Sequence, residues 1–346
     1  MAKDSSPNAA ANDVSLRDKV EFLSSSRAYP EFEGEVDVRE THMAWVFLAG
    51  ERVYKLKKPV EYKHRDCHFL RDREFLCHEE VRLNRRLAPE VYLGVSSLRL
   101  TSEGTLEIDG EGEVVDWLVV MTRLPEHLLL DVALAKGTVT RARITRVAER
   151  LADFYQGLEP VEISVKEYLA HFAHEHDRNR EVIGDTRFSL PSDEVAAVLG
   201  RLERLLKEEP DLLGDRVRQG RVVEGHGDLR PEHVCLTDPP VVIDCLEFSQ
   251  PLRRVDPFDE LSFLGLECDR LGAAWVGKQL VNECARMLGE RPCRRLLAFY
   301  TAYRACLRAR LTLAHLLEPD PRTPDKWEPR ARQYLAMARR ACRELD

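Results

Sequence analysis

The chain has 346 residues, which corresponds to about two domains at the usual size of roughly 100–200 residues each. Apolar residues make up 44% of it, and 60 acidic against 52 basic residues leave a formal charge of -8. This balance argues against a basic nucleic-acid-binding protein, and no apolar run is long enough to span a membrane. Residues 1–13 are polar and lack the apolar segment of a secretion signal, so a disordered leader and a cytoplasmic location are predicted.

The nine cysteines form no C-x-x-C pair, which argues against a zinc site. Scattered cysteines in a cytoplasmic chain are most often buried free thiols, and we expect that here.

The first third of the chain is expected to be rich in strands. A short helix near residues 15–25 opens it, and Gly50-Glu51 separates two strand-like runs by the spacing of a hairpin. A longer helix is predicted over residues 70–87 and closes at Ala88-Pro89. The predicted strands are, in chain order, 36–39, 44–49, 52–57, 98–108 and 114–122.

The chain is mostly helical from residue 128 onward. Short apolar runs with Gly and Pro-Pro turns interrupt this pattern only at residues 222–248. The change in pattern predicts an α+β protein with a small β-rich lobe, residues 14–124, and a larger helical lobe, residues 125–346.

Two lysines lie inside the strand predicted at residues 52–57. Strand alternation places Val53, Lys55 and Lys57 on one face. Lysines in an apolar strand either protect an exposed sheet edge or serve a function. The functional alternative is that a lysine in a Val-x-Lys run reaches the phosphates of a nucleotide.

The helix predicted at residues 70–87 offers a partner for such a lysine. Leu76 and Leu83 mark an apolar stripe, and Glu80 lies within it. A buried carboxylate has to be paired, so an ion pair between Lys55 and Glu80 is predicted. The alternative is that Glu80 lies at the solvated margin of the stripe.

The strongest signal is His226-Gly-Asp-Leu-Arg-Pro-Glu-His233, followed by two apolar runs around a Pro-Pro turn that end at Asp244. The runs predict a hairpin in which His233 and Asp244 lie opposite each other. Asp228 precedes this hairpin, so three groups able to accept a proton or bind a metal converge. The alternative is a loop whose polar side chains only cap turns.

These motifs, in this order, resemble the aminoglycoside phosphotransferase and choline kinase-like superfamily, which shares the protein-kinase fold. The runs that begin at Val53, Glu80, Ile243 and Tyr303 resemble a bacterial branch in which some members carry an additional P-loop domain. The chain lacks a P-loop motif and resembles the stand-alone form. The resemblance implies a bilobal protein-kinase-like fold and ATP-dependent phosphorylation of a hydroxyl on a small polar metabolite, an aminoglycoside or a sugar-like compound.

The same resemblance implies roles for individual residues. Asp228 matches the catalytic base, and Asp244 with His233 matches the pair that binds Mg²⁺ or Mn²⁺. The residues expected to bind the nucleotide are Lys55, Lys57, Glu80, Thr41, Met121, Thr122 and Arg123. Those expected at the acceptor substrate are Glu247, Asp256, Tyr303 and Arg304. Tyr303 and Arg304 are expected on one helix face, and the alternative is that they belong to the core. An Asp of the Asp256-Pro-Phe-Asp259 stretch resembles the one that braces the catalytic loop in the family, and the alternative is that these acids only begin a helix.

One departure from the family pattern leaves a second function open. His233 stands where the family has Asn, and imidazole suits Mg²⁺ poorly because this ion prefers oxygen ligands. A nucleotide-binding pseudokinase is therefore the alternative. A kinase of protein side chains would need a longer segment than residues 245–255 after Asp244. The expected partner is a small molecule, with no nucleic acid and no membrane, and the sequence does not specify an oligomeric state.

Overall fold

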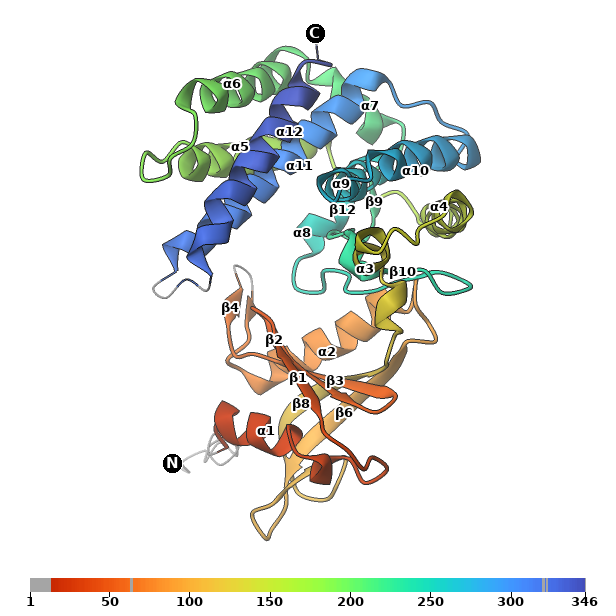
Figure 1. Ribbon diagram of the computed structural model, residues 1–346, viewed down its shortest axis with the longest axis vertical. Coiled ribbons are helices and arrows are strands. Elements are labelled where there is room, and N and C mark those ends of the chain that lie inside the picture. The colour runs from red at the N-terminus through yellow and green to blue at the C-terminus, as the bar shows by residue number, and fades with distance from the viewer. Residues whose placement is uncertain (1–13, 63–64, 319–320, 322, 346) are drawn as a thin grey trace, which may run out of the picture. The chain divides into compact units, whose positions relative to one another are not determined.

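The computed structural model describes residues 14–62, 65–318, 321 and 323–345 (Figure 1). The predicted disordered leader, residues 1–13, lies outside them. The chain divides into two compact units. The first ends at Pro125 and also includes Val242–Gln250, whereas the second comprises Glu126–Val241 and the chain from Pro251 onward.

The first unit is built on a six-stranded sheet with the strand order β1-β2-β3-β8-β6-β7. Neighbouring strands in this sheet are antiparallel. Its elements are α1 (Leu16–Leu23), η1 (Ser26–Ala28), β1 (Asp37–Glu40), β2 (Ala44–Ala49), β3 (Arg52–Lys57), β4 (Glu61–Tyr62), β5 (Arg65–Asp66), α2 (Leu70–Asn84), β6 (Tyr92–Leu100), β7 (Leu106–Ile108) and β8 (Glu113–Thr122).

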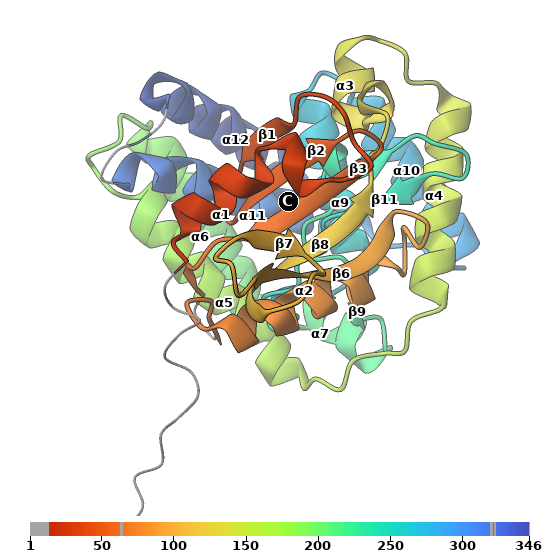
Figure 2. The same ribbon diagram turned by 90° about the horizontal axis from the view of Figure 1, so that it is seen from below.

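The two helices of this unit cover opposite faces of the sheet (Figure 2). Leu23 at the end of α1 belongs to one buried cluster with Phe47 and Leu56 of the sheet. Because side chains alternate along a strand, the neighbours of Leu56 in β3 point to the other face, which α2 covers. Residues 53, 55 and 57 of β3 therefore lie on the α2 side.

The second unit is mainly helical. Its elements are η2 (Glu126–Leu128), α3 (Leu130–Ala135), α4 (Arg141–Gln156), α5 (Val165–Ile183), α6 (Ser192–Glu208), α7 (Asp211–Arg218), β9 (Val223–Glu224), η3 (Pro231–His233), β10 (Val234–Cys235), β11 (Val241–Val242), α8 (Gln250–Arg253), β12 (Arg254–Val255), α9 (Pro257–Arg270), α10 (Ala274–Met287), α11 (Arg294–Ala314), η4 (His315–Leu317), η5 (Pro324–Lys326) and α12 (Trp327–Cys342). Strand β11 and helix α8 contain the two boundaries of the inserted segment 242–250.

Helix α9 packs against α10 and α11 in the second unit. Asp256 caps its first turn by accepting a hydrogen bond from the Phe258 amide, and Pro257 occupies the first helical position. Most of the residues of α9 are buried. Gly265 of α9 meets Gly277 of α10 so closely that a Cβ added to Gly265 would lie 2.9 Å from the Gly277 Cα. The missing side chains let these two helices pack in direct backbone contact.

The predicted α+β class is confirmed, and the predicted elements of the first unit are present with shifted ends. The runs at 44–49 and 52–57 are β2 and β3, and the helix predicted to residue 87 ends at Asn84. The strand predicted from residue 98 begins earlier, at Tyr92. Gly94 and the serines that follow it conceal this part of β6 because they break the apolar alternation.

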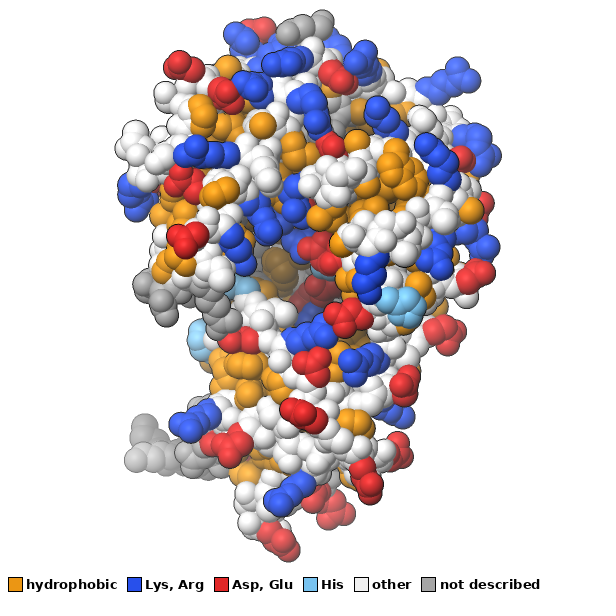
Figure 3. Space-filling view, in the orientation of Figure 1, with side chains coloured by type: hydrophobic (Ala, Val, Ile, Leu, Met, Phe, Trp, Pro, Cys, Tyr) orange, Lys and Arg blue, Asp and Glu red, His pale blue; other side chains and the backbone are white. Residues whose placement is uncertain are grey.

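No helix within the described ranges is both long and apolar enough to cross a membrane. On the face of the molecule in Figure 3, Lys and Arg side chains are interspersed with Asp and Glu. Eight of the nine cysteines are at least partly buried, as expected, and only Cys293 is exposed.

The glycine contact between α9 and α10 makes a prediction about stability. Gly265→Ala forces the two helix backbones apart and is expected to lower the free energy of unfolding by about 1–3 kcal/mol, the usual range for overpacking. Gly200→Ala in α6, where an added Cβ meets no atom within 4 Å, is the control. It is expected to raise stability by about 0.5–1 kcal/mol through helix propensity. Urea denaturation measures both, and equal effects would contradict the packing argument.

Candidate active site

The side chain of Glu80 is a carboxylate with no exposure to solvent, held between two lysines of β3. Lys55 Nζ donates to Glu80 Oε1 at 2.9 Å, and Lys57 Nζ donates to Glu80 Oε2 at 2.5 Å. The predicted pairing of Lys55 with Glu80 is confirmed. The alternatives of an edge-protecting lysine and a solvated Glu80 are wrong, because β3 lies inside the sheet and Glu80 is buried.

The protonation states in this cluster follow from burial and charge. Burial alone would raise the pKa of Glu80, but Lys55 and Lys57 outweigh it and hold this pKa below its ordinary 4.5. Burial would lower the pKa of Lys55, but Asp244 and Glu80 outweigh it and raise this pKa well above 10.5. Glu80 therefore contributes stability above pH 4.5 that is lost as the pH falls through its lowered pKa. The contribution of Lys55 is present below pH 10.5 and is lost as the pH rises through its raised pKa.

The segment 242–250 belongs to the first unit, although it was predicted in the helical lobe of residues 125–346. Two acidic residues of the segment form ion pairs with β3, which accounts for its place in the first unit. Asp244 accepts a hydrogen bond from Lys55 Nζ at 2.7 Å, and Glu247 accepts one from Lys57 Nζ at 2.5 Å. A hairpin pattern in the sequence cannot reveal such pairs, because their members are separated by about 190 positions.

The backbone at Asp244 is left-handed, with a φ of 63°. A residue with a Cβ rarely adopts this conformation unless neighbouring contacts hold it there. Two hydrogen bonds do so: the Asp244 amide donates to the Tyr92 hydroxyl at 3.1 Å, and the Cys245 amide donates to Asn84 Oδ1 at 2.9 Å. The carboxylate of Asp244 remains 45% exposed. The protein therefore fixes the backbone at this position and leaves the side chain accessible.

In the second unit, Glu260 of α9 holds the loop that contains Asp228. Its carboxylate accepts hydrogen bonds from the amides of His226, at 2.9 Å, and Gly227, and from the Tyr155 hydroxyl at 2.9 Å. The predicted brace was an Asp of the stretch that begins at Asp256, so this assignment needs correction. Glu260 lies four residues after the Asp256 cap and on the same face of α9, so helical spacing alone does not distinguish the two carboxylates.

Asp228 is partly exposed, with 26% of its side chain accessible. Its backbone carbonyl accepts a hydrogen bond from His233 Nδ1 at 2.8 Å, and Arg230 Nε lies 3.6 Å from its carboxylate. Since a carbonyl only accepts, His233 carries a proton on Nδ1. In the neutral imidazole, Nε2 is then the nitrogen able to bind a metal.

The residues predicted to bind the nucleotide base lie at the end of β8. Met121 pairs with Val53 and Tyr92 in the sheet. The amides of Thr122 and Arg123 donate to Val91 and Glu51 carbonyls, each at 2.8 Å. Their contact with a base stays a prediction.

Thr41 lies in the turn between β1 and β2. Its hydroxyl donates to the Ala44 carbonyl at 3.0 Å and accepts from the Ala44 amide at 2.9 Å. These bonds close the turn, and a contact of Thr41 with phosphate stays a prediction.

Three residues predicted at the acceptor substrate lie in the interior of the second unit. Asp256 accepts hydrogen bonds from Arg216 and Tyr300, and Arg304 donates two hydrogen bonds to the carboxylate of Asp259, at 2.7 and 2.6 Å. Tyr303 is 3% exposed and packs against aromatic rings of α5 and α11. The contacts of each of these three residues give it a structural role in the core of the unit, which explains why that amino acid is present there. The fourth residue, Glu247, is the partner of Lys57.

Within the described part of the chain, no three His, Cys, Asp or Glu side chains are grouped so that they could hold a metal ion. Mg²⁺ in nucleotide sites usually takes one or two carboxylates and fills its remaining positions with phosphate oxygens and water. The accessible carboxylate of Asp244 fits a site of this type.

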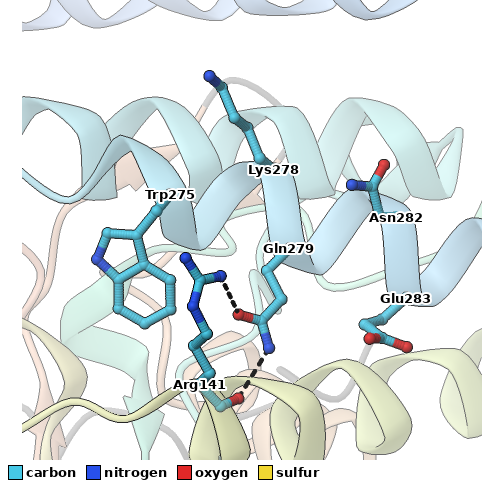
Figure 4. A pocket seen from close by; sticks show the side chains of 6 residues that line it. All are labelled: Arg141, Trp275, Lys278, Gln279, Asn282 and Glu283. Carbon is cyan, nitrogen blue, oxygen red and sulfur yellow. Dashed lines mark hydrogen bonds between the residues drawn. The ribbon is translucent and has the colours of Figure 1, made fainter.

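A separate surface pocket of about 370 Å³ lies between α4 and α10 (Figure 4). The Arg141 guanidinium lies over the Trp275 ring at 5.1 Å and donates to Gln279 Oε1 at 3.3 Å. None of its lining residues was predicted for the site. The hydrogen bonds between Arg141 and Gln279 connect the two helices at this pocket.

The fold and the Lys–Glu and Asp arrangements define a phosphotransferase-like protein. The model of the phosphotransferase enzyme family matches residues 52–297, and the chain belongs to this family. Curated relatives from Mycobacterium tuberculosis and Mycobacterium bovis, both called uncharacterized proteins, are 31% identical over 303 residues. The match covers 83% of this chain and 56% of theirs, so the chain spans little more than half their length.

Solved structures show the same protein-kinase-like fold. A choline/ethanolamine kinase family protein from Mesorhizobium loti has a TM-score of 0.54 at 15% identity, covering 94% of this chain and 99% of that chain. Choline kinase from Cryptosporidium parvum has a TM-score of 0.54 at 9% identity, with coverage of 95% and 96%. The GDP complex of an aminoglycoside 2'-phosphotransferase-IIIa mutant has a TM-score of 0.53 at 12% identity, with coverage of 93% and 97%.

The contacts of Glu260 predict a large loss of stability on truncation. Glu260→Ala leaves two backbone amides and a tyrosine hydroxyl without their buried acceptor. We expect the free energy of unfolding to fall by about 3 kcal/mol or more, since each lost bond to a charged group costs roughly 1.5–3 kcal/mol. Glu208→Ala, at an exposed position in α6, is the control and should change it by less than about 0.5 kcal/mol. Chemical denaturation measures both, and a similar small change in the two variants would contradict the bracing role.

Proposed function

We propose that the protein is an ATP-dependent phosphotransferase that phosphorylates a hydroxyl group of a small polar molecule. The observation that carries this proposal is the arrangement on β3, where Lys55 contacts both the buried Glu80 and the accessible Asp244. Family membership supports it independently. Phosphoryl transfer needs positioned charges more than covalent help, and this cluster supplies them.

Each residue has a separate role in this proposal. Lys55 binds the phosphates of the nucleotide, and Glu80 holds its ammonium group in place. Asp228 accepts the proton of the acceptor hydroxyl, and its partly exposed side chain suits this task. Asp244 would hold a divalent metal with phosphate oxygens and His233, and this metal would neutralise charge on the transferred phosphoryl group.

The nucleotide and the acceptor both need experimental identification. One structural neighbour is a GDP complex, which gives a reason to compare ATP with GTP. The names of the neighbours, choline kinase and aminoglycoside phosphotransferase, suggest amino alcohols and aminoglycosides as acceptors, and sugars and sugar acids extend the panel. Incubation of the purified protein with each nucleotide, Mg²⁺ or Mn²⁺ and this panel, followed by mass spectrometry, tests the proposal. A phosphorylated product supports it, and nucleotide binding without a product from any acceptor supports the pseudokinase alternative.

Asp228→Asn tests the catalytic base. The amide cannot accept the proton, so we expect the turnover rate to fall by about 10²–10⁴-fold, the usual contribution of general-base catalysis. The dissociation constant of the nucleotide should stay within a few-fold, because Asp228 contacts the acceptor. Steady-state kinetics and titration calorimetry measure the two quantities. Unchanged turnover would remove Asp228 from the mechanism.

His233→Asn tests the alternative of a pseudokinase. His233 stands where the family pattern has Asn, and the substitution replaces a ring nitrogen with an amide oxygen, the type of ligand that Mg²⁺ prefers. We expect the ratio of Mg²⁺-supported to Mn²⁺-supported turnover to rise in the variant. A silent parent and an active variant would favour the pseudokinase. The same ratio in both proteins would show that His233 does not contact the metal.

A further inference from the structure

The two lysines of β3 have different surroundings, although the sequence predicts that both bind the nucleotide. Lys55 is 15% exposed and Lys57 only 3%. Lys55 contacts Asp244, whose carboxylate is accessible, whereas the partners of Lys57 are little exposed: Glu80 is buried and the side chain of Glu247 is 10% exposed. The cluster therefore has an accessible end at Lys55 and a closed end at Lys57.

A nucleotide contact by Lys57 would require its ammonium group to leave two carboxylates, each 2.5 Å away. Breaking these two ion pairs would leave the Lys57 ammonium, which is 3% exposed, away from the carboxylates that balance its charge, and the loss of a partner from a buried ion pair is strongly unfavourable. Lys57 therefore stays bound to Glu80 and Glu247.

The ion pair between Lys57 and Glu247 also affects Asp244, because Glu247 lies in the same segment. The two residues lie in one segment, three positions apart, and the backbone at Asp244 is left-handed. The contacts of Tyr92 and Asn84 hold the segment at residues 244 and 245. Lys57 holds it further along, at residue 247, beside Phe248, which packs against Cys67 and Leu76.

We propose that Lys57 is a positioning residue that fixes the segment 242–250 to β3 and so presents Asp244 beside Lys55. The significance for catalysis rests on the proposed function, because Asp244 matters there as the metal-binding residue. Lys57 has a second effect on the same cluster. When Lys55 turns towards a phosphate group, Glu80 keeps a cationic partner, so Lys55 leaves without creating an unpaired buried charge.

Hydrogen–deuterium exchange of the full-length protein tests the proposal without any assay of activity. The reporter is the peptide that covers residues 242–250, whose amides at 244 and 245 are bonded to Tyr92 and Asn84. Lys57→Met keeps an unbranched side chain but removes the charge. We expect exchange in this peptide to become at least about tenfold faster, since local opening controls the exchange rate. Lys57→Arg keeps the charge and should restore most of the protection.

Arg52→Met is the matched control, because it removes a positive charge from the same strand at an exposed position. Its exchange in residues 242–250 should equal that of the parent. If Lys57→Met does not fold, Glu247→Gln decides, since it removes the same ion pair at the segment itself. Parent-like exchange in whichever of these two variants is folded would overturn the proposal.

Kinetics then separate this proposal from the proposed function. If the protein transfers phosphate, Lys57→Met should raise the KM for the metal–nucleotide complex at least about tenfold, and Lys57→Arg should recover most of it. Faster exchange in a protein that transfers phosphate to no acceptor would support the positioning role and count against the kinase assignment. Parent-like exchange with impaired turnover would overturn the positioning role alone.

Discussion

The buried carboxylate of Glu80 is the group on which the rest of the first unit depends. An unexposed charge is costly unless it is paired, and Lys55 and Lys57 both pair with it. The requirement sets the orientation of α2 against β3, since the helix has to present Glu80 to the strand. The same two lysines then attract Asp244 and Glu247, so one buried charge organises a helix, a strand and a distant segment.

The two units carry different parts of the proposed chemistry. In the first unit, ion pairs hold Lys55, Glu80 and Asp244 in place, and such an arrangement suits the proposed site for nucleotide phosphates and metal. The second holds the loop of Asp228 by its backbone, through Glu260, and leaves the Asp228 side chain partly exposed. Bracing through the backbone fixes the position of the loop and leaves the side chain accessible, as the proposed role of a general base requires.

The sequence predicts features that follow from short-range periodicity. Strand alternation and helical spacing are enough to bring Lys55 and Glu80 together, and the patterns at 44–49 and 52–57 give β2 and β3. It does not predict features that depend on long-range pairing or on which of two similar residues is buried. Lys55 and Lys57 are equivalent in an alternation pattern, and their different partners in the distant segment, Asp244 and Glu247, distinguish them. The choice of Glu260 over Asp256 also depends on the contacts of the loop, although both carboxylates lie on one helical face.

The left-handed backbone at Asp244 restricts which amino acids this position tolerates. Asp, Asn and Gly adopt this conformation most readily, whereas a β-branched residue would be forced out of it. Substitutions at this position are therefore expected to have two different effects on the protein. An asparagine there removes the charge and keeps the shape of the segment, but a valine would remove both. A natural relative with Asn at this position would retain the fold of the family without the carboxylate proposed to bind the metal, and only the side chain would reveal the difference.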